Sequence, residues 1–164
     1  YGYDLETRGY YLLVLAVSSM SAAFAWGAAD RIFGSYRMPV LLGALLTLAM
    51  LLWIALVGKM SPAALFVWFL SYGLVTGYPP LLVGQAREMF PRELVGRGLT
   101  LLNLATMGGV FVFQFATGAV IGFMSPNQTV YPLAAYQAAF GLMAGLLAIS
   151  IACYLWASDR QQAG

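Results

Sequence analysis

The feature that most constrains this chain is the placement of its charges. Residues 9–29, 38–58, 60–86 and 98–158 contain no Asp, Glu, Lys or Arg, and apolar side chains dominate each stretch. An α-helix needs about 20 predominantly apolar residues to cross the hydrocarbon core of a bilayer. The three shorter stretches therefore hold one span each, whereas turn residues at 125–128 divide the long fourth stretch into two. The sequence predicts an all-α integral membrane protein with five transmembrane helices, at about residues 9–29, 38–58, 61–85, 98–123 and 132–157.

Composition excludes several classes of function. With 9% charged residues and a net charge of +2, the chain has too few charges for a small soluble domain and too few cations to bind nucleic acid. It has no histidine and a single cysteine, Cys153, so it cannot build a Cys/His metal site or a disulfide framework on its own. An intramembrane enzyme would need an acid, base or activated nucleophile inside a span. We therefore expect no enzymatic activity, no metal and no cofactor.

The Lys and Arg residues of the short loops predict the orientation, because they accumulate on the cytoplasmic side. Five spans put the amino-terminal tail and the loops at Lys59 and at 125–131 on one side, which carries Arg8 and Lys59. The opposite side carries six: Arg31, Arg37, Arg87, Arg92, Arg97 and Arg160. We expect the amino end outside and the carboxyl end in the cytoplasm, in the inner (plasma) membrane of a bacterium. An external start without a signal peptide also suggests that further helices precede Tyr1 and that the chain is a fragment of a larger protein.

Two loops on the predicted cytoplasmic side have distinctive sequences. The loop between the first two spans reads Gly27-Ala28-Ala29-Asp30-Arg31-Ile32-Phe33-Gly34-Ser35-Tyr36-Arg37, which favours a tight, charged turn between helices. Residues 87–109 begin Arg-Glu-Met-Phe-Pro-Arg-Glu and continue through Gly-Arg-Gly to Asn103 and the pair Gly108-Gly109.

Together these loops resemble the major facilitator superfamily of transporters, whose signature loop reads roughly G-x-x-x-D-R-x-G-x-R-R. The spacing differs here, since Gly27 is one residue closer to Asp30, and Gly34 one residue further from Arg31, than in the family. The resemblance covers nearly the whole chain. It implies that the five spans are the eighth to twelfth helices of a twelve-helix transporter whose amino-terminal half is missing. It also implies that Asp30, Arg31 and Arg37 form a cytoplasmic gate, with Asp30 meeting the start of a helix in the other half; the alternative is that these charges only fix the topology.

The fourth span carries a polar stripe on an otherwise apolar helix. At 100° per residue, Asn103, Thr106, Gln114 and Thr117 fall within a stripe roughly 80° wide. Polar side chains in a membrane face either a partner helix or a watery cavity. Asn103, Thr106 and Gln114 are therefore candidates for the substrate pathway, and hydrogen bonding between helices is the alternative.

The third span contains two adjacent prolines. Pro79 and Pro80 remove two backbone donors and clash with the preceding turn, so the helix should kink or open there as a hinge. Discontinuous helices near the midplane recur in the binding sites of transporters. Tyr72, Thr76 and Tyr78 would present hydroxyl groups to a ligand at the hinge, and by the resemblance this is the tenth helix, which lines the cavity. The alternative is an interfacial bend that packs against its neighbours.

These observations predict a secondary active transporter that moves a small solute by alternating access. Its partners would be the small-molecule substrate, with or without a coupling ion, the lipid bilayer and the missing amino-terminal half. Because no charged residue lies within any span, an intramembrane charge for coupling would come from that other half. The alternative is a five-helix membrane scaffold, or a subunit of an assembly, without transport activity of its own.

Overall fold

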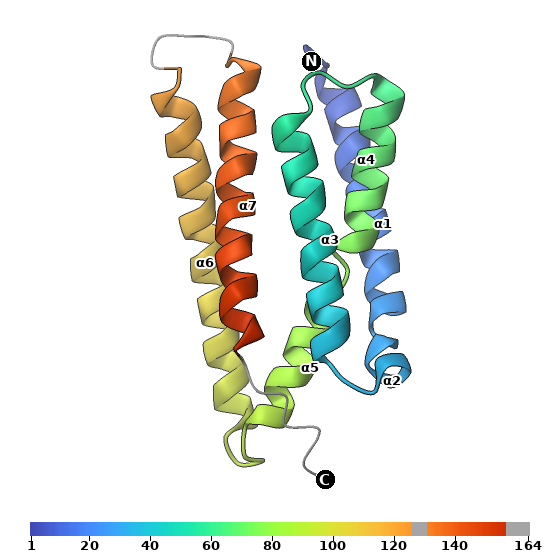
Figure 1. Cartoon of the computed structure of the whole chain (residues 1–164), viewed down its shortest axis with the longest axis vertical. Helices are drawn as coiled ribbons and strands as arrows, with labels where there is room; N and C mark the ends of the chain where they lie inside the picture. The colour runs from blue at the N-terminus through green and yellow to red at the C-terminus, as the bar shows by residue number, and fades with distance from the viewer. Residues whose placement is uncertain (126–130, 157–164) are drawn as a thin grey trace. The chain divides into compact units, whose positions relative to one another are not determined.

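The computed structural model describes residues 1–125 and 131–156, and all regular structure within these ranges is helical. Five helical segments are long and apolar enough to cross a membrane: Leu5–Trp26, Arg37–Leu56, Pro62–Met89, Val95–Phe123 and Leu133–Leu155. The predicted all-α membrane fold with five spans is confirmed (Figure 1). Residues 126–128 of the predicted turn, residue 157 of the predicted fifth span and Arg160 lie outside the described residues.

The described residues divide into two compact units. The first unit holds Tyr1–Thr47 and Lys59–Gln85, and the second holds Leu48–Gly58 with residues 86–125 and 131–156. The division falls inside α3 (Arg37–Leu56) and close to the end of α5 (Pro79–Met89).

Polar residues start the two long helices of the first unit. Asp4 precedes α1 (Leu5–Trp26), and its carboxylate accepts a hydrogen bond of 3.1 Å from the backbone N–H of Thr7. Ser61 precedes α4 (Pro62–Val75) and accepts one of 3.2 Å from the N–H of Ala64. Each cap satisfies one of the amides that a first turn leaves unpaired. The first span therefore begins four residues earlier than the charge pattern predicts and ends at Trp26, before the loop glycine.

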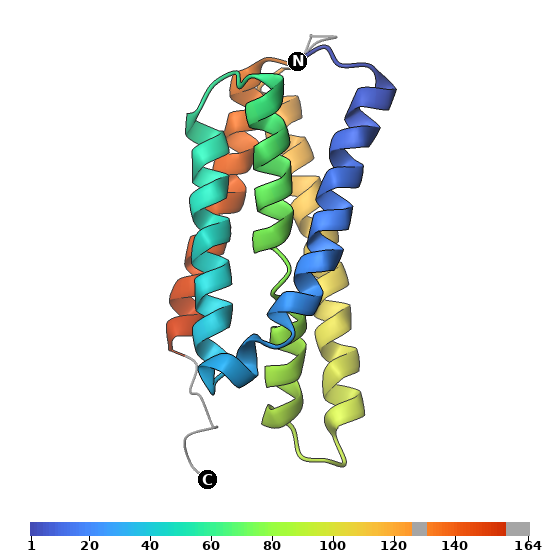
Figure 2. The same ribbon diagram turned by 90° about the vertical axis from the view of Figure 1, so that its right-hand side faces the viewer.

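Small residues let α1 and α4 approach each other closely within the first unit (Figure 2). Ser18 and Ala22 are buried on α1 and lie against Gly73 and Gly77. A Cβ atom on Gly73 would collide with the Ser18 side chain and come within 2.8 Å of the carbonyl oxygen of Leu15. A Cβ atom on Gly77 would lie 2.6 Å from that of Ala22. Pairs of small residues four positions apart are a common basis of close helix packing in membranes.

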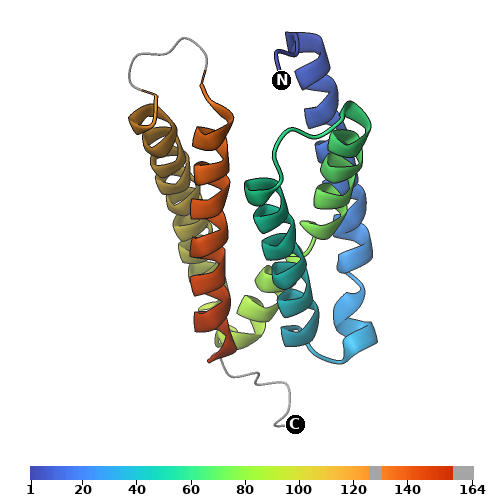
Figure 3. The same cartoon turned by 45° about the horizontal axis from the view of Figure 1, so that its top comes forward.

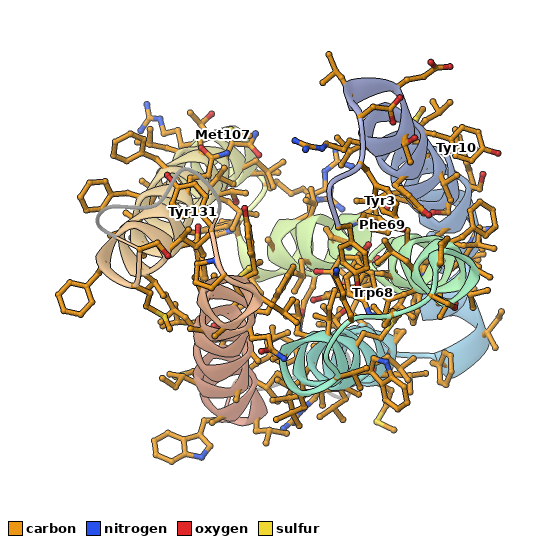
Figure 4. The ribbon with its side chains drawn as sticks, turned by 90° about the horizontal axis from the view of Figure 1, so that it is seen from above. Tyr3, Tyr10, Trp68, Phe69, Met107 and Tyr131 are labelled. Atoms are coloured by element: carbon orange, nitrogen blue, oxygen red, sulfur yellow. The ribbon has the colours of Figure 1, made fainter. Side chains whose placement is uncertain are left out.

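Aromatic rings continue the contact between α1 and α4 toward the amino-terminal end of each helix (Figure 4). The Tyr11 ring lies 5.7 Å from that of Tyr3 and 5.4 Å from that of Phe69. The Tyr11 hydroxyl donates to the carbonyl oxygen of Pro62 at 3.2 Å, so this buried ring also has a polar partner. Aromatic pairs of this kind stabilise a contact by about 0.5–1.5 kcal/mol beyond the area they bury.

The second unit is built around α6 (Val95–Phe123) and α7 (Leu133–Leu155), which run antiparallel beside each other (Figures 1 and 3). Large apolar side chains on α6, such as Leu104, Met107 and Phe111, are exposed. The second unit thus offers the broad apolar surface that suits a helix in contact with lipid.

Candidate functional site

The third span is interrupted near its middle. Helix α4 ends at Val75 and α5 begins at Pro79, so that Thr76–Tyr78 form a non-helical break between them (Figure 2). Pro79 and Pro80 occupy the first two positions of α5, where a missing N–H is tolerated, but they cannot donate to the turn before them. The interruption lies at the two prolines, where the sequence predicts it. The role of this interruption as a moving hinge stays a prediction.

Helix α1 supports this break from one side. The indole N–H of Trp26 donates to the carbonyl oxygen of Leu74 at 2.9 Å, and the Trp26 ring meets the Tyr78 ring edge-on with centroids 6.2 Å apart. The Ser19 hydroxyl lies 3.4 Å from that of Thr76. One face of α1 therefore contacts the last turn of α4 and the break itself.

The three candidate hydroxyls of the third span lie in the first unit, on α4 and at the break. Tyr72, Thr76 and Tyr78 are all half-buried. The Tyr72 ring stacks on that of Trp68 with centroids 4.8 Å apart, and the Tyr78 ring packs against Gly43, where a Cβ atom would collide with it. The Thr76 hydroxyl donates to the carbonyl oxygen of Tyr72 at 2.9 Å. Because that donor is already used, Thr76 offers a ligand its oxygen lone pairs.

The polar stripe of the fourth span belongs to the second unit. Asn103, Thr106 and Gln114 are exposed, and Thr117 is half-buried. The Thr106 hydroxyl donates to the carbonyl oxygen of Leu102 at 2.8 Å, which satisfies it within α6. Within the described residues the amides of Asn103 and Gln114 have no hydrogen-bond partner, so they are the two polar groups of the stripe still free to bind water or a ligand.

The expected tight turn between the first two spans is instead a short helix, α2 (Ala29–Phe33). Gly34 ends it with φ of +62°, a left-handed conformation that glycine adopts without strain. Arg31 is exposed, and Arg37 begins α3 with its backbone N–H donating to the Ser35 hydroxyl at 3.1 Å. Asp30 is half-buried, and its Oδ1 atom is buried with no hydrogen-bond partner among the described residues.

Sequence reasoning missed two features. The first is the support of the break by Trp26, which nothing in the sequence connects with the third span. The second is an open depression of about 500 Å³ at the start of α6, lined by Glu93, Gly96, Arg97, Thr100, Leu101 and Leu104. The spacing of three and four residues between these positions was the available signal, since it places them along one face of a helix.

The fold defines an integral membrane protein with five spans, one of them broken. No protein-family model matches the chain, and no curated protein or solved structure is significantly similar to it. The likeness to the major facilitator superfamily therefore rests on the motifs quoted above.

Proposed function

We propose that the chain is the carboxyl-terminal part of a secondary transporter of the major facilitator type, which moves a small solute by alternating access. The observation that carries this proposal is the break at Thr76–Tyr78, halfway along a span of 28 residues. A continuous helix is the default solution in lipid because it satisfies every backbone group internally. A break at membrane depth with hydroxyl side chains around it is typical of a helix that binds or gates a solute.

The break also gives the span two parts that can change their angle. Helix α4 packs against α1 at Gly73, and the break packs against α1 at Gly77, whereas no helical hydrogen bond from Pro79 or Pro80 ties the start of α5 to α4. In the proposed mechanism, α1 and α4 move as one body and α5 tilts about the break. In the second unit, Asn103 and Gln114 on α6 remain candidate polar groups of the substrate pathway.

The loop that contains Asp30 supports the same proposal. A buried carboxylate oxygen without a hydrogen bond is costly, so Oδ1 of Asp30 calls for a donor from outside the described residues. The first turn of a helix supplies such donors, because its N–H groups are free and carry partial positive charge. A helix of the other half, meeting Asp30 when the cytoplasmic gate is closed, has the required chemistry.

The first test is to read the coding sequence upstream of Tyr1. The proposal expects an open reading frame with about seven further apolar spans, which would complete two six-helix halves. A start codon within a few residues of Tyr1 would overturn it, and a five-helix scaffold or assembly subunit would then be the better hypothesis.

The second test measures which side of α6 meets water. In the natural protein carrying Cys153→Ser, the variants Asn103→Cys and Gln114→Cys should react with a membrane-impermeant maleimide in native vesicles. Ala105→Cys and Phe111→Cys are matched controls at similar depth on exposed apolar positions, and they should stay unlabelled because lipid covers them. Equal protection of all four positions would show that the stripe packs against helices and would favour the scaffold.

A further inference from the structure

The broken span leaves a set of backbone carbonyl groups that no donor satisfies. In an α-helix each carbonyl accepts from the N–H four residues later. The carbonyls of Val75 and Thr76 lose this partner outright, because residues 79 and 80 are prolines. The carbonyl of Gly77 loses it because the N–H of Leu81 donates to Tyr78 instead, at 2.9 Å.

Neighbouring donors compensate for none of these three bonds. The indole N–H of Trp26 donates to the carbonyl of Leu74, one residue before them. The Thr76 hydroxyl is used by the carbonyls of Tyr72 and Gly73, at 2.9 and 3.3 Å. Among the described residues, the carbonyls of residues 75–77 therefore have no partner, and neither do the backbone N–H groups of Gly77 and Tyr78.

The depth of the break makes these groups significant. Thr76–Tyr78 follow 14 helical residues of α4 and precede 11 of α5, so they lie near the middle of the span. An unpaired backbone group costs several kcal/mol in hydrocarbon, and non-helical backbone is tolerated only where it is buried in protein or lines a watery cavity. Gly77 is buried, whereas Val75, Thr76 and Tyr78 are half-buried, so the break is partly exposed.

The chemistry of the break favours a small cation with a single charge. The ligands it offers are the three carbonyl oxygens and the hydroxyl oxygens of Ser19 and Thr76, which lie 3.4 Å apart. Hard cations prefer oxygen ligands, and the last carbonyls of α4 carry partial negative charge. The two prolines also remove two of the free N–H groups that would otherwise make the start of α5 attractive to anions. The carboxylate of the span, Glu88, lies near the end of α5 and away from the break, so the break itself offers a neutral set of oxygens, which suits a monovalent ion better than a divalent one.

We propose that the break binds Na⁺, held by the carbonyl oxygens of Val75, Thr76 and Gly77 and by the hydroxyl oxygens of Ser19 and Thr76. Water completes the coordination and pairs with the free N–H groups. The role of this Na⁺ as a coupling ion rests on the proposed transport function. The binding of the ion does not depend on that function.

The test is equilibrium binding of radiolabelled Na⁺ to the natural protein in lipid nanodiscs, with choline maintaining the ionic strength. Pro79→Ala with Pro80→Ala restores two N–H groups to the carbonyls of Val75 and Thr76, so binding should fall at least tenfold without loss of helix by circular dichroism. Pro62→Ala is the matched control. Pro62 is the first residue of α4, and an N–H group at that position has no carbonyl within the helix to which it could donate. This variant should bind Na⁺ as the unmodified protein does.

A milder pair of variants keeps the proposal testable if the double proline variant does not fold. Ser19→Ala removes one hydroxyl ligand and should weaken Na⁺ binding several-fold. Ser21→Ala on the same helix should leave binding unchanged, because its hydroxyl is exposed and bonds only to the carbonyl of Val17. Absence of saturable Na⁺ binding to the unmodified protein, or unchanged binding in Ser19→Ala and in the proline variant, would overturn the proposal.

Failure of this site and failure of the transport function give different results. Saturable Na⁺ binding that depends on Ser19 upholds the site even if the upstream sequence shows no further spans. Conversely, a complete twelve-span protein without saturable Na⁺ binding upholds the transporter and overturns the site.

Discussion

Gly73 and Gly77 allow α1 and α4 to approach because their missing side chains leave room for Ser18 and Ala22. The same spacing occurs at Gly118/Gly122 and at Gly141/Gly145, yet nothing lies within 4 Å of a Cβ atom built on any of those four glycines. The sequence alone cannot tell these pairs apart, because the difference depends on which residues a neighbouring helix presents. The close contact is specified jointly by two segments that lie about 50 residues apart in the chain.

This contrast predicts different consequences for the same substitution. Gly73→Ala should destabilise the fold by about 1–3 kcal/mol, the usual cost of forcing extra atoms into a tight contact. Gly118→Ala, in open space on α6, should be neutral or stabilise the helix by less than ~1 kcal/mol. Unfolding of the two variants in mixed micelles, by titration with a denaturing detergent, measures both values. Equal effects at the two positions would contradict the α1–α4 contact.

At the scale of the helix, local chemistry decides which boundaries can be predicted. The break in the third span follows from Pro79 and Pro80. These prolines lack N–H groups, so two helical hydrogen bonds are lost regardless of which helices lie nearby. Helix α2 has no such signal: Ala28 precedes it without a side-chain cap, and only the left-handed Gly34 ends it firmly. Helix α1 begins four residues before the predicted first span, because Glu6 and Arg8 are compatible with the first turn of a helix that extends out of the bilayer.

The start of α1 gives a prediction about pH. The hydrogen bonds from Thr7 lower the pKa of Asp4, because they favour the ionised carboxylate. A lowered pKa means that the cap stabilises the helix above the ordinary carboxyl pKa, and that this contribution is lost as the pH falls through the lowered value. Hydrogen exchange at the Thr7 amide, corrected for intrinsic rate, should therefore lose protection on acidification. Asp4→Asn should remove this pH dependence, because asparagine caps a helix without titrating; the same acid sensitivity in that variant would rule out Asp4 as its source.

For the whole molecule, the number of spans was predictable. The free-energy cost of placing a charged side chain in lipid is larger than the free energy of most individual packing contacts, so charges are kept out of the spans. The fourteen charged residues delimit four apolar stretches, and the turn residues at 125–128 divide the longest of them into two spans. The partners of Ser18 and Trp26 were not predictable, because each depends on contacts between residues that are distant in the sequence. The candidate site divides in the same way: the prolines mark the break, whereas the support by α1 appears only when the chain is folded.

The charge distribution also predicts which ends of the spans face the cytoplasm. Ile32 in α2 and Gly58 after α3 lie at opposite ends of α3, and both are exposed, so a probe can reach either one. The Lys and Arg residues predict that the loop at Ile32 is cytoplasmic and the loop at Gly58 external. In a Cys153→Ser background, Gly58→Cys should react with an impermeant maleimide in right-side-out vesicles, and Ile32→Cys should react only in inside-out vesicles. The reverse pattern would invert the topology and, with it, move Asp30 away from the cytoplasmic gate; labelling of both positions from one side would mean that α3 does not cross the membrane.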